Sequence, residues 1–581
     1  MSKHYTDEKN VQILIALLKK FGIKKIVASP GTTNISFVRS LQNDSFFEIY
    51  SCIDERSAAY MACGLAHESG EPVVLSCTGA TASRNYMSGL TEAYYRKLPI
   101  LAVTSTQEIS KVGHHIAQVI DRSLMPRDTV KHSVQLSLVK DENDWRDCEV
   151  KANNAILELW RRGGGPVHIN LTTGYSRVFD SVSLPRVRTI RRITTQTKVW
   201  PSMPEGKVAV FIGSHARMSD KQVSALEHFC SSYDAVVFCD HTSGYKGKYY
   251  VNHSLCSSQR LAGSNDMRPD LLIHIGEITG DYSIGALVGK QVWRVNEDGE
   301  LRDTFGHLKY IFEMPEQSFF EYYAKQDKHG NDQYLELCLA QLEDVRNKIP
   351  ALPFSNIWIA EKMHNLIPDN STIHFGILNS LRAWNFFELP KTVESSSNVG
   401  GFGIDGCLSS LLGASLANKN KLYFGVIGDL AFFYDINSLG NRHVGNNLRI
   451  LLVNNGTGTE FKNFNHPAAL FGETANDFVA GSGHFGNQSR SLVKNYSENL
   501  GFEYLSASNK EEFEQVYERF LTNKILDRPI LLEVFTDHLD ESNALETITS
   551  ISTSVKGKAK ESIKSVVGKD NIAKIRKMLK R

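Results

Sequence analysis

The sequence lacks the features that mark several classes of protein. Its nine cysteines form no CxxC pair, which argues against a zinc site and against a disulfide framework. The formal net charge is +1, so nothing in the composition points to a nucleic-acid partner. No apolar run approaches the length of a transmembrane helix, and the polar segment 1–10 is unlike a signal peptide. We therefore expect a cytoplasmic enzyme, with about three or four domains for its length.

What the sequence does contain is a strand–crossover–strand pattern in 422–462. Its first apolar run ends in Gly428-Asp429, its second ends in Asn454-Asn455-Gly456, and roughly 433–444 between them can form a helix. Because the carboxyl ends of parallel strands meet at one edge of a sheet, the carboxylate and the side-chain amide should lie close together. These are the oxygen ligands that Mg²⁺ prefers when a substrate's phosphates also hold it. The pattern predicts a diphosphate site, with an ordinary αβ unit as the alternative.

The whole chain alternates short apolar runs with helical segments, which predicts an α/β fold of doubly wound parallel sheets. The expected domains cover 1–180, 181–350 and 351–552, and a basic tail, 553–581, follows them. That tail could lie on an anionic membrane surface or remain solvated. Segment 176–206 is polar and proline-bearing, as linkers are. The strands that we expect are 26–28, 48–53, 73–77, 100–104, 208–212, 235–239, 271–275, 292–295, 372–375, 422–427, 450–453 and 530–535.

Several other residues have two interpretations when they are read alone. Glu55 opens a helix, where a carboxylate usually interacts with the helix dipole. His114 and His115 could act as acid and base groups near neutral pH, or could be a solvated pair in a loop. The glycine-rich segment 398–406 would let backbone amides approach a diphosphate. Segment 461–486 could be a mobile lid or an ordinary surface loop.

Three stretches resemble one enzyme family. A Gly-Asp followed 26 residues later by Asn-Asn is similar to the signature of thiamine-diphosphate (ThDP) enzymes. Leu430 after the Gly-Asp, then Tyr434-Asp435-Ile436-Asn437, resembles the menaquinone-pathway SEPHCHC synthase branch. The segments DERSAAYMACGLA at 54–66 and NVGGFGIDG at 398–406 also resemble that branch, and the similarity covers about 1–550.

The resemblance implies three α/β domains (pyrimidine-binding, middle and diphosphate-binding) that hold ThDP and Mg²⁺. The metal ligands would be Asp429, Asn455 and the main-chain carbonyl of Thr457. Glu55 would activate the cofactor, Ile404 would hold it bent, and Gln118 would reach it from the loop before Met125. The other positions that match the family's cofactor-binding residues are Thr78, Gly79, Gly376, Gly403, Gly428 and Leu430.

The implied reaction is decarboxylation of a 2-oxo acid and transfer of the resulting acyl-anion equivalent to an acceptor. A simple 2-oxo acid decarboxylase and an inactive ThDP-fold scaffold are the alternatives. The family also implies a homodimer or homotetramer with active sites at the subunit interface.

The chain departs from the family at its substrate residues. Arginines that grip substrate carboxylates in the family are replaced here by Thr33, Val399 and Gln107. Neither Thr nor Val can replace a bidentate guanidinium, so we expect different substrates. Arg382 is the remaining candidate for a substrate carboxylate, and Thr32 and Thr33 are further substrate candidates.

Overall fold

The computed structural model describes residues 4–122, 124–260, 266–324, 330–483 and 489–552. The chain forms two units, of which the first holds the residues up to Thr197 together with Gly299–Ile311. The second holds Lys198–Asp298 and the chain from Phe312 onward. The basic tail, 553–581, and its expected membrane contact lie outside the described residues. Among the described helices, none has both the length and the apolar character that crossing a membrane requires.

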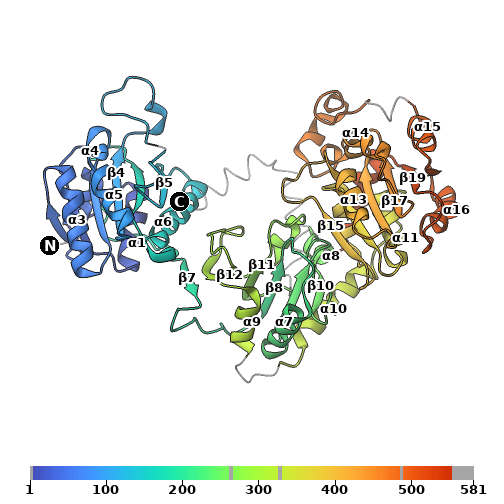
Figure 1. Cartoon of the computed structure of the whole chain (residues 1–581), viewed down its shortest axis with the longest axis horizontal. Helices are drawn as coiled ribbons and strands as arrows, with labels where there is room; N and C mark the ends of the chain where they lie inside the picture. Colours follow the sequence, from blue (N-terminus) through green and yellow to red (C-terminus); the bar gives the residue numbers. More distant parts are fainter. Residues whose placement is uncertain (1–3, 123, 261–265, 325–329, 484–488, 553–581) are drawn as a thin grey trace. The chain divides into compact units, whose positions relative to one another are not determined.

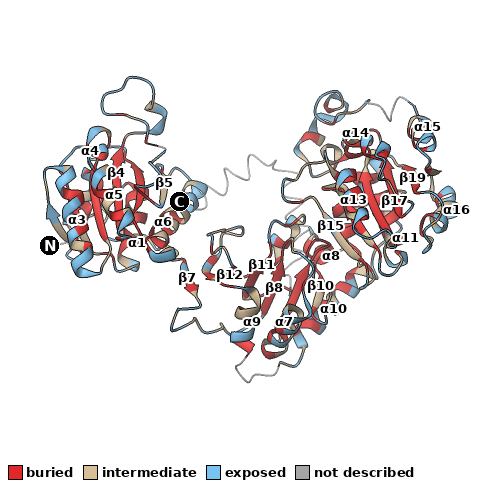
Figure 2. Ribbon diagram, viewed as in Figure 1, coloured by how far each residue is buried: buried red, intermediate tan, exposed pale blue. Residues whose placement is uncertain are grey.

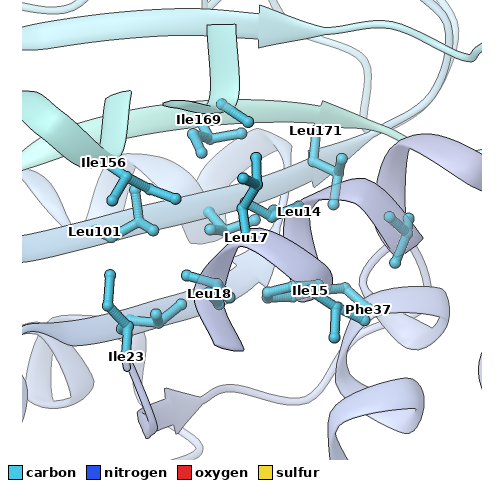
Figure 3. Packing of buried hydrophobic residues seen from close by; sticks show 14 of the residues in the cluster. Leu14, Ile15, Leu17, Leu18, Ile23, Phe37, Leu101, Ile156, Ile169 and Leu171 are labelled. Carbon is cyan, nitrogen blue, oxygen red and sulfur yellow. The ribbon is translucent and has the colours of Figure 1, made fainter. Parts of the chain in front are cut away.

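The first unit is built on a parallel sheet with the strand order β2-β1-β3-β4-β6-β5. Figure 1 labels β4 and β5 of this sheet and the helices around it. Helix α1 buries one apolar face because Leu14, Leu17 and Leu18 recur at helical spacing. Figure 3 shows these leucines packed with Leu101 of β4 and with residues of α6 and β6. The elements are α1 (Lys9–Lys20), β1 (Lys25–Ala28), α2 (Ile35–Gln42), β2 (Glu48–Ser51), α3 (Glu55–Ser69), β3 (Val73–Thr78), α4 (Ala80–Asn85), α5 (Met87–Tyr95), β4 (Ile100–Thr106), β5 (His132–Leu136), α6 (Glu142–Glu158), β6 (Val167–Thr172) and β7 (Arg191–Thr194).

The segment that follows β6, and the segment Gly299–Ile311, are bonded to the rest of this first unit. The Gly174 amide donates to Glu8 Oε2 at 3.0 Å, and the Ile190 amide donates to Asn153 Oδ1 at 2.9 Å. Arg188 Nη1 lies 2.7 Å from Asp303 Oδ2, a residue more than a hundred positions along the chain. The early part of the expected linker, 176–206, is therefore held against the unit by specific hydrogen bonds and an ion pair.

The second unit contains two further parallel sheets. In the first of them, the strands of this unit run in the order β10-β9-β8-β11-β12. Its elements are β8 (Val208–Ile212), α7 (Asp220–Tyr233), β9 (Val236–Cys239), β10 (Tyr250–Asn252), α8 (Ser254–Ser257), β11 (Leu271–Ile275), β12 (Gln291–Asn296), α9 (Glu316–Ala324) and α10 (Gln333–Arg346). Strand β13 (Leu308–Glu313) begins in the first unit.

The last sheet has the order β15-β14-β16-β17-β19-β18, which repeats the topology of the first unit's sheet. Its four inner strands are mostly buried, its edge strands β15 and β18 are partly exposed, and its helices expose their outer faces (Figure 2). The elements are α11 (Asn356–Met363), β14 (Thr372–Phe375), α12 (Asn379–Asn385), β15 (Glu394–Ser397), α13 (Cys407–Leu416), β16 (Tyr423–Gly428), α14 (Asp429–Tyr434), β17 (Leu448–Asn454), α15 (Leu492–Asn499), β18 (Glu503–Ala507), α16 (Lys510–Phe520), β19 (Ile530–Phe535) and α17 (His538–Ile548). These parallel sheets confirm the predicted α/β class.

The crossover between β16 and β17 differs from the expected helix over roughly 433–444. Helix α14 begins at Asp429 and ends at Tyr434, and a short 3₁₀ turn, Ile436–Gly440, follows. The break falls at Asp435, whose buried carboxylate accepts hydrogen bonds from the Ser409 amide at 2.6 Å and the Ser438 hydroxyl at 2.6 Å. The short side chain of an aspartate that accepts hydrogen bonds in this way competes with the backbone hydrogen bonds of a continuous helix.

Candidate cofactor and active site

The residues of the predicted diphosphate site come together at the carboxyl edge of the last sheet. The chain leaves β14 at Gly376, β16 at Gly428 and β17 at Asn455. Strands β14 and β16 are neighbours, and the connections that follow them run in opposite directions along the sheet. This is the topological switch point, where open α/β sheets bind their ligands.

The carboxylate of Asp429 is held in place by backbone donors. Its residue is only 4% exposed, and it opens α14 directly after Gly428. The Leu430 amide donates to Oδ1 at 2.7 Å, and the Gly456 amide donates to Oδ2. Burial raises the pKa of Asp429 to about 6, although these backbone hydrogen bonds act in the opposite direction. A cation beside this buried carboxylate would offset the cost of its burial.

A cavity of ≈110 Å³ lies at this edge and is lined by most of the predicted set. Its volume exceeds that of a single water several times over. The predicted residues that line it are Gly376, Ile404, Gly428, Asp429, Leu430, Asn455 and Thr457. Gly403 is not among the lining residues but directly precedes Ile404. The structure therefore brings the diphosphate and metal candidates to one cavity.

The donor set fits a hard cation such as Mg²⁺. A carboxylate, an amide oxygen and a main-chain carbonyl are all oxygen ligands, which Mg²⁺ combines with phosphate oxygens and water. No cluster of three or more His, Cys, Asp or Glu side chains that could hold a metal occurs within the described residues. The set Asp429, Asn455 and Thr457 contains one carboxylate, so it would leave the remaining coordination positions to a diphosphate and water.

Sequence reasoning missed Glu541, a residue of α17 that lines the same cavity. Its Oε1 accepts from the Asn356 amide at 2.9 Å and from the Thr536 hydroxyl at 2.8 Å. Burial raises the pKa of this carboxyl to about 7, and the charges of Asp540 and Asp429 act in the same direction. A glutamate in an amphipathic helix gives no sequence signal of this burial.

Arg382, the candidate for a substrate carboxylate, already binds a carboxylate. Its Nη1 lies 2.7 Å from Glu460 Oε2 and its Nη2 lies 3.1 Å from Glu460 Oε1, a bidentate pair. Glu460 lines the diphosphate cavity, and Arg382 lines a second cavity of ≈440 Å³. Leu378 lines both cavities and has a φ of +63°, which is strained for a leucine.

The other predicted residues belong to the first unit. Glu55 is the first residue of α3, and the preceding Asp54 caps this helix by accepting from the Ser57 amide at 2.7 Å. Thr78 ends β3, and the next residue, Gly79, caps α4. Burial is the main cause of the raised pKa of Cys77, which precedes Thr78 in β3, and the charge of Glu55 raises this pKa further. These residues lie at the carboxyl edge of the first sheet.

Thr32 and Thr33 differ in their surroundings. Thr32 is exposed, whereas Thr33 is buried and donates its hydroxyl to the Ser105 carbonyl at 2.7 Å. The Thr33 carbonyl in turn accepts from the Thr173 hydroxyl at 2.9 Å. The hydroxyl of Thr33 therefore connects the loop after β1 to β4.

The loop between β4 and β5 carries Gln118, His114 and His115, and all three side chains are exposed. His115 and Gln118 have positive φ values of 55° and 64°. The loop is anchored by Arg122, which sequence reasoning also missed. Its buried guanidinium donates to Thr104 Oγ1 at 3.1 Å and to Asn170 Oδ1, and burial lowers its pKa to about 10.

Comparison with known proteins identifies one enzyme family. Residues 9–125 match the family model "Thiamine pyrophosphate enzyme, N-terminal TPP binding domain". The 2-succinyl-5-enolpyruvyl-6-hydroxy-3-cyclohexene-1-carboxylate synthase (SEPHCHC synthase) of Bacteroides fragilis is 30% identical over 562 residues, covering 93% of this chain and 98% of that protein. The synthase of the same name from Phocaeicola vulgatus is 30% identical over 582 residues, with the same coverage of both chains.

A more distant relative with this name, from Flavobacterium psychrophilum, is 26% identical over 555 residues and covers 90% of this chain and 95% of that protein. Among solved structures, the thiamine diphosphate-dependent 4-hydroxybenzoylformate decarboxylase of Rhodococcus jostii RHA1 is 17% identical. It covers 91% of this chain and 99% of that chain, with a TM-score of 0.40.

The parallel sheets, the cavity at a switch point and the matched domain define this chain as a thiamine-diphosphate-dependent enzyme. More closely, the chain belongs to the SEPHCHC synthase family. The reaction of this family is the decarboxylation of a 2-oxo acid and the transfer of the resulting acyl-anion equivalent to an acceptor.

Proposed function

We propose that this enzyme is a Mg²⁺- and ThDP-dependent carboligase whose substrates differ from those of its SEPHCHC synthase relatives. The observation that carries the proposal is the cavity that gathers Asp429, Asn455, Thr457 and Ile404 at the switch point of the last sheet. ThDP, when bound, supplies the electron sink that makes loss of CO₂ from a 2-oxo acid possible.

The metal would be held by the Asp429 carboxylate, the Asn455 amide oxygen and the Thr457 carbonyl. Backbone donors already fix the Asp429 carboxylate, so little reorganisation is needed for binding. Ile404 would press against the cofactor from the glycine-rich loop. In the first unit, Glu55 would accept a hydrogen bond from the aminopyrimidine ring, with Thr78, Gly79 and Gln118 as further contacts.

The substrates follow from the arginines that are missing and from the one that remains. Gln107, Thr33 and Val399 cannot grip carboxylates as the family's arginines do. Arg382 is the proposed carboxylate contact, and an incoming carboxylate would exchange with Glu460 in the guanidinium fork. His114 and His115 are exposed and are the candidates for proton transfer, and Thr32 is exposed and available to a substrate.

The assembly that we propose is a homodimer or homotetramer acting in the cytoplasm, with each active site shared between two subunits. Analytical ultracentrifugation at micromolar concentration tests this. A monomer with full turnover would contradict it, because Glu55 and Asp429 are proposed to act from different subunits.

The activity is tested by measuring CO₂ release from a panel of 2-oxo acids with ThDP and Mg²⁺, with and without aldehyde or alkene acceptors. Release that accelerates with an acceptor supports the carboligase and names its donor. Release that is indifferent to acceptors would instead show a simple decarboxylase. No release, together with no ThDP binding by calorimetry, would show a scaffold.

Two sets of variants separate the roles. Glu55→Gln should abolish turnover and leave Mg²⁺-dependent ThDP binding, whereas the matched control Glu68→Gln, on the same helix and exposed, should leave both unchanged. Arg382→Met should raise KM for the acid, and Glu460→Gln should lower KM because it frees the guanidinium. Equal KM values in these two variants would remove Arg382 from the substrate site.

A further inference from the structure

The carboxyl group of Glu541 lines the diphosphate cavity but does not belong to the predicted metal ligands. Glu541 lies in α17, is 7% exposed, and packs beside α11 and the 3₁₀ turn Thr459–Lys462. Its Oε1 accepts from the Asn356 amide at 2.9 Å and from the Thr536 hydroxyl at 2.8 Å. These two hydrogen bonds hold the carboxyl group in one orientation at the wall of the cavity.

The second oxygen of this group, Oε2, is available to a ligand. It accepts no hydrogen bond from the described residues, yet it is not sealed from solvent as the fully buried polar atoms of this protein are. Glu541 also lines a neighbouring cavity of ≈10 Å³, which has room for about one water. The diphosphate cavity, at ≈110 Å³, is therefore the space in which Oε2 can meet a larger ligand.

The charges that line the cavity are acidic. Among the described residues of its wall there is no lysine, arginine or histidine, whereas Asp429, Glu460 and Glu541 are carboxylic acids. Glu460 is compensated by its ion pair with Arg382, which lies outside this wall. Asp429 and Glu541 make no ion pair with any described residue, so a ligand of this cavity meets two carboxyl groups without a fixed counter-charge.

The cations on the elements around α17 are bonded to other groups. Lys462 donates to the Gly472 carbonyl at 3.0 Å, Lys362 of α11 pairs with Glu514 at 2.7 Å, and Arg260 pairs with Glu546 at 3.5 Å. The other charged or titratable groups on α11, on α17 with its cap and at the opposite wall are Glu361, Asp537, His538, Asp540 and Asp429. The charges of Asp540 and Asp429 both raise the pKa of Glu541.

The ligand proposed for this cavity adds more negative charge. A diphosphate carries more negative charge than one Mg²⁺ neutralises, and the Asp429 carboxylate adds to it. An ionised Glu541 would be repelled by this ligand, whereas a protonated carboxyl group has an O–H that donates a hydrogen bond to an anionic oxygen. Burial already raises the pKa of Glu541 to about 7, so protonation costs little near neutral pH.

We propose that Glu541 is a further cofactor-binding residue, which takes up a proton when Mg²⁺ and ThDP bind and donates its Oε2–H to an anionic oxygen of the diphosphate. The proton comes from the solvent, so cofactor binding is linked to pH. Above about pH 7 the free carboxyl group is ionised and must be protonated for binding, which weakens the affinity as the pH rises. The inference rests on the proposed function, because it requires the diphosphate in this cavity.

The test is calorimetric titration of the full-length enzyme with ThDP at saturating Mg²⁺, from about pH 7.5 to about pH 9, in two buffers with different ionisation enthalpies. In this range the phosphates and Asp429, whose pKa is about 6, are already ionised. The wild type should lose up to about tenfold in affinity for each pH unit. It should also take up close to one more proton per bound ThDP than Glu541→Gln takes up.

The Glu541→Gln variant isolates the proton. Its amide keeps an oxygen for Asn356 and Thr536 and places an N–H donor where the Oε2–H of the protonated acid would be. Its affinity for ThDP should therefore be nearly independent of pH and should exceed that of the wild type at about pH 9. The matched control Glu546→Gln, on the exposed side of the same helix, should keep the pH dependence of the wild type.

Two results would overturn the inference while ThDP still binds. One is a pH dependence that is absent from the wild type or that survives in Glu541→Gln. The other is weaker binding in Glu541→Gln than in the wild type at about pH 9, which would show that an ionised Glu541 contacts the cation or its water. Absence of ThDP binding in all three proteins would instead contradict the proposed function, and the inference would fail with it.

Discussion

Glu541→Gln should stabilise the protein at neutral and alkaline pH. The carboxyl is buried beside the diphosphate cavity, and its pKa is raised to about 7 from an ordinary value of 4.5. The difference between about 7 and 4.5, at about 1.36 kcal/mol for each pH unit, is about 3 kcal/mol. Glutamine removes the buried charge and keeps the oxygen that accepts from Asn356 and Thr536.

The pH dependence has a definite sign. A carboxyl whose pKa is raised in the folded state is destabilising when ionised, so the penalty is absent below about pH 4.5. The penalty grows between about pH 4.5 and 7 and is constant above that range. The variant should therefore gain up to about 3 kcal/mol above pH 7 and nothing near pH 4.5.

The assay is amide hydrogen exchange of α17 in the apo enzyme at a series of pH values, corrected for intrinsic exchange. A chain of several domains need not unfold in one step, so protection of the helix itself is more informative than a global midpoint. Glu546→Gln, on the exposed side of the same helix, is the control and should shift protection little at any pH. A gain for Glu541→Gln that is equal at pH 5 and pH 8 would refute the reasoning.

Three further substitutions test packing and the loop between β4 and β5. Leu14→Ala leaves a cavity in the core of the first unit and should cost about 2–5 kcal/mol in urea unfolding, where less than about 1 kcal/mol would contradict tight packing. Gly89→Ala places a Cβ 2.4 Å from the Ala59 Cβ and should cost about 1–3 kcal/mol, whereas Gly64→Ala, which meets nothing within 4 Å, should not lower Tm. Arg122→Met should increase proteolysis within 107–125 and lower turnover, because two buried hydrogen bonds of the guanidinium are lost; unchanged cleavage would show that other contacts hold the loop.

The buried strands were the most predictable part of the fold. The expected strands 372–375 and 530–535 coincide with β14 and β19, because continuous apolar runs in parallel sheets are buried on both faces. The connection after Asp429 was predicted less well. Its helix ends where the Asp435 carboxylate bonds Ser409, which lies 26 positions earlier and leaves no local pattern.

The residues of the site also divide into those that the sequence pattern predicts and those that it does not. Asp429 and Asn455 were expected at one sheet edge, and both line one cavity there, because strand ends determine their positions. Glu541 and Arg122 could not be found in this way. Their burial depends on partners from distant segments, such as Asn356 and Asn170, which only the folded chain brings to them.

The return of Gly299–Ile311 to the first unit has a practical consequence. Arg188 holds Asp303, and the Arg192 guanidinium donates to the Gly299 carbonyl at 2.9 Å. A protease cut anywhere within 198–298 would therefore leave the two fragments associated, since a piece of the later fragment completes the earlier one. Such a nicked enzyme should migrate as one species in a native gel and as two in denaturant. An N-terminal fragment that ends at Thr197 should need residues 299–311, added in trans, to complete its fold.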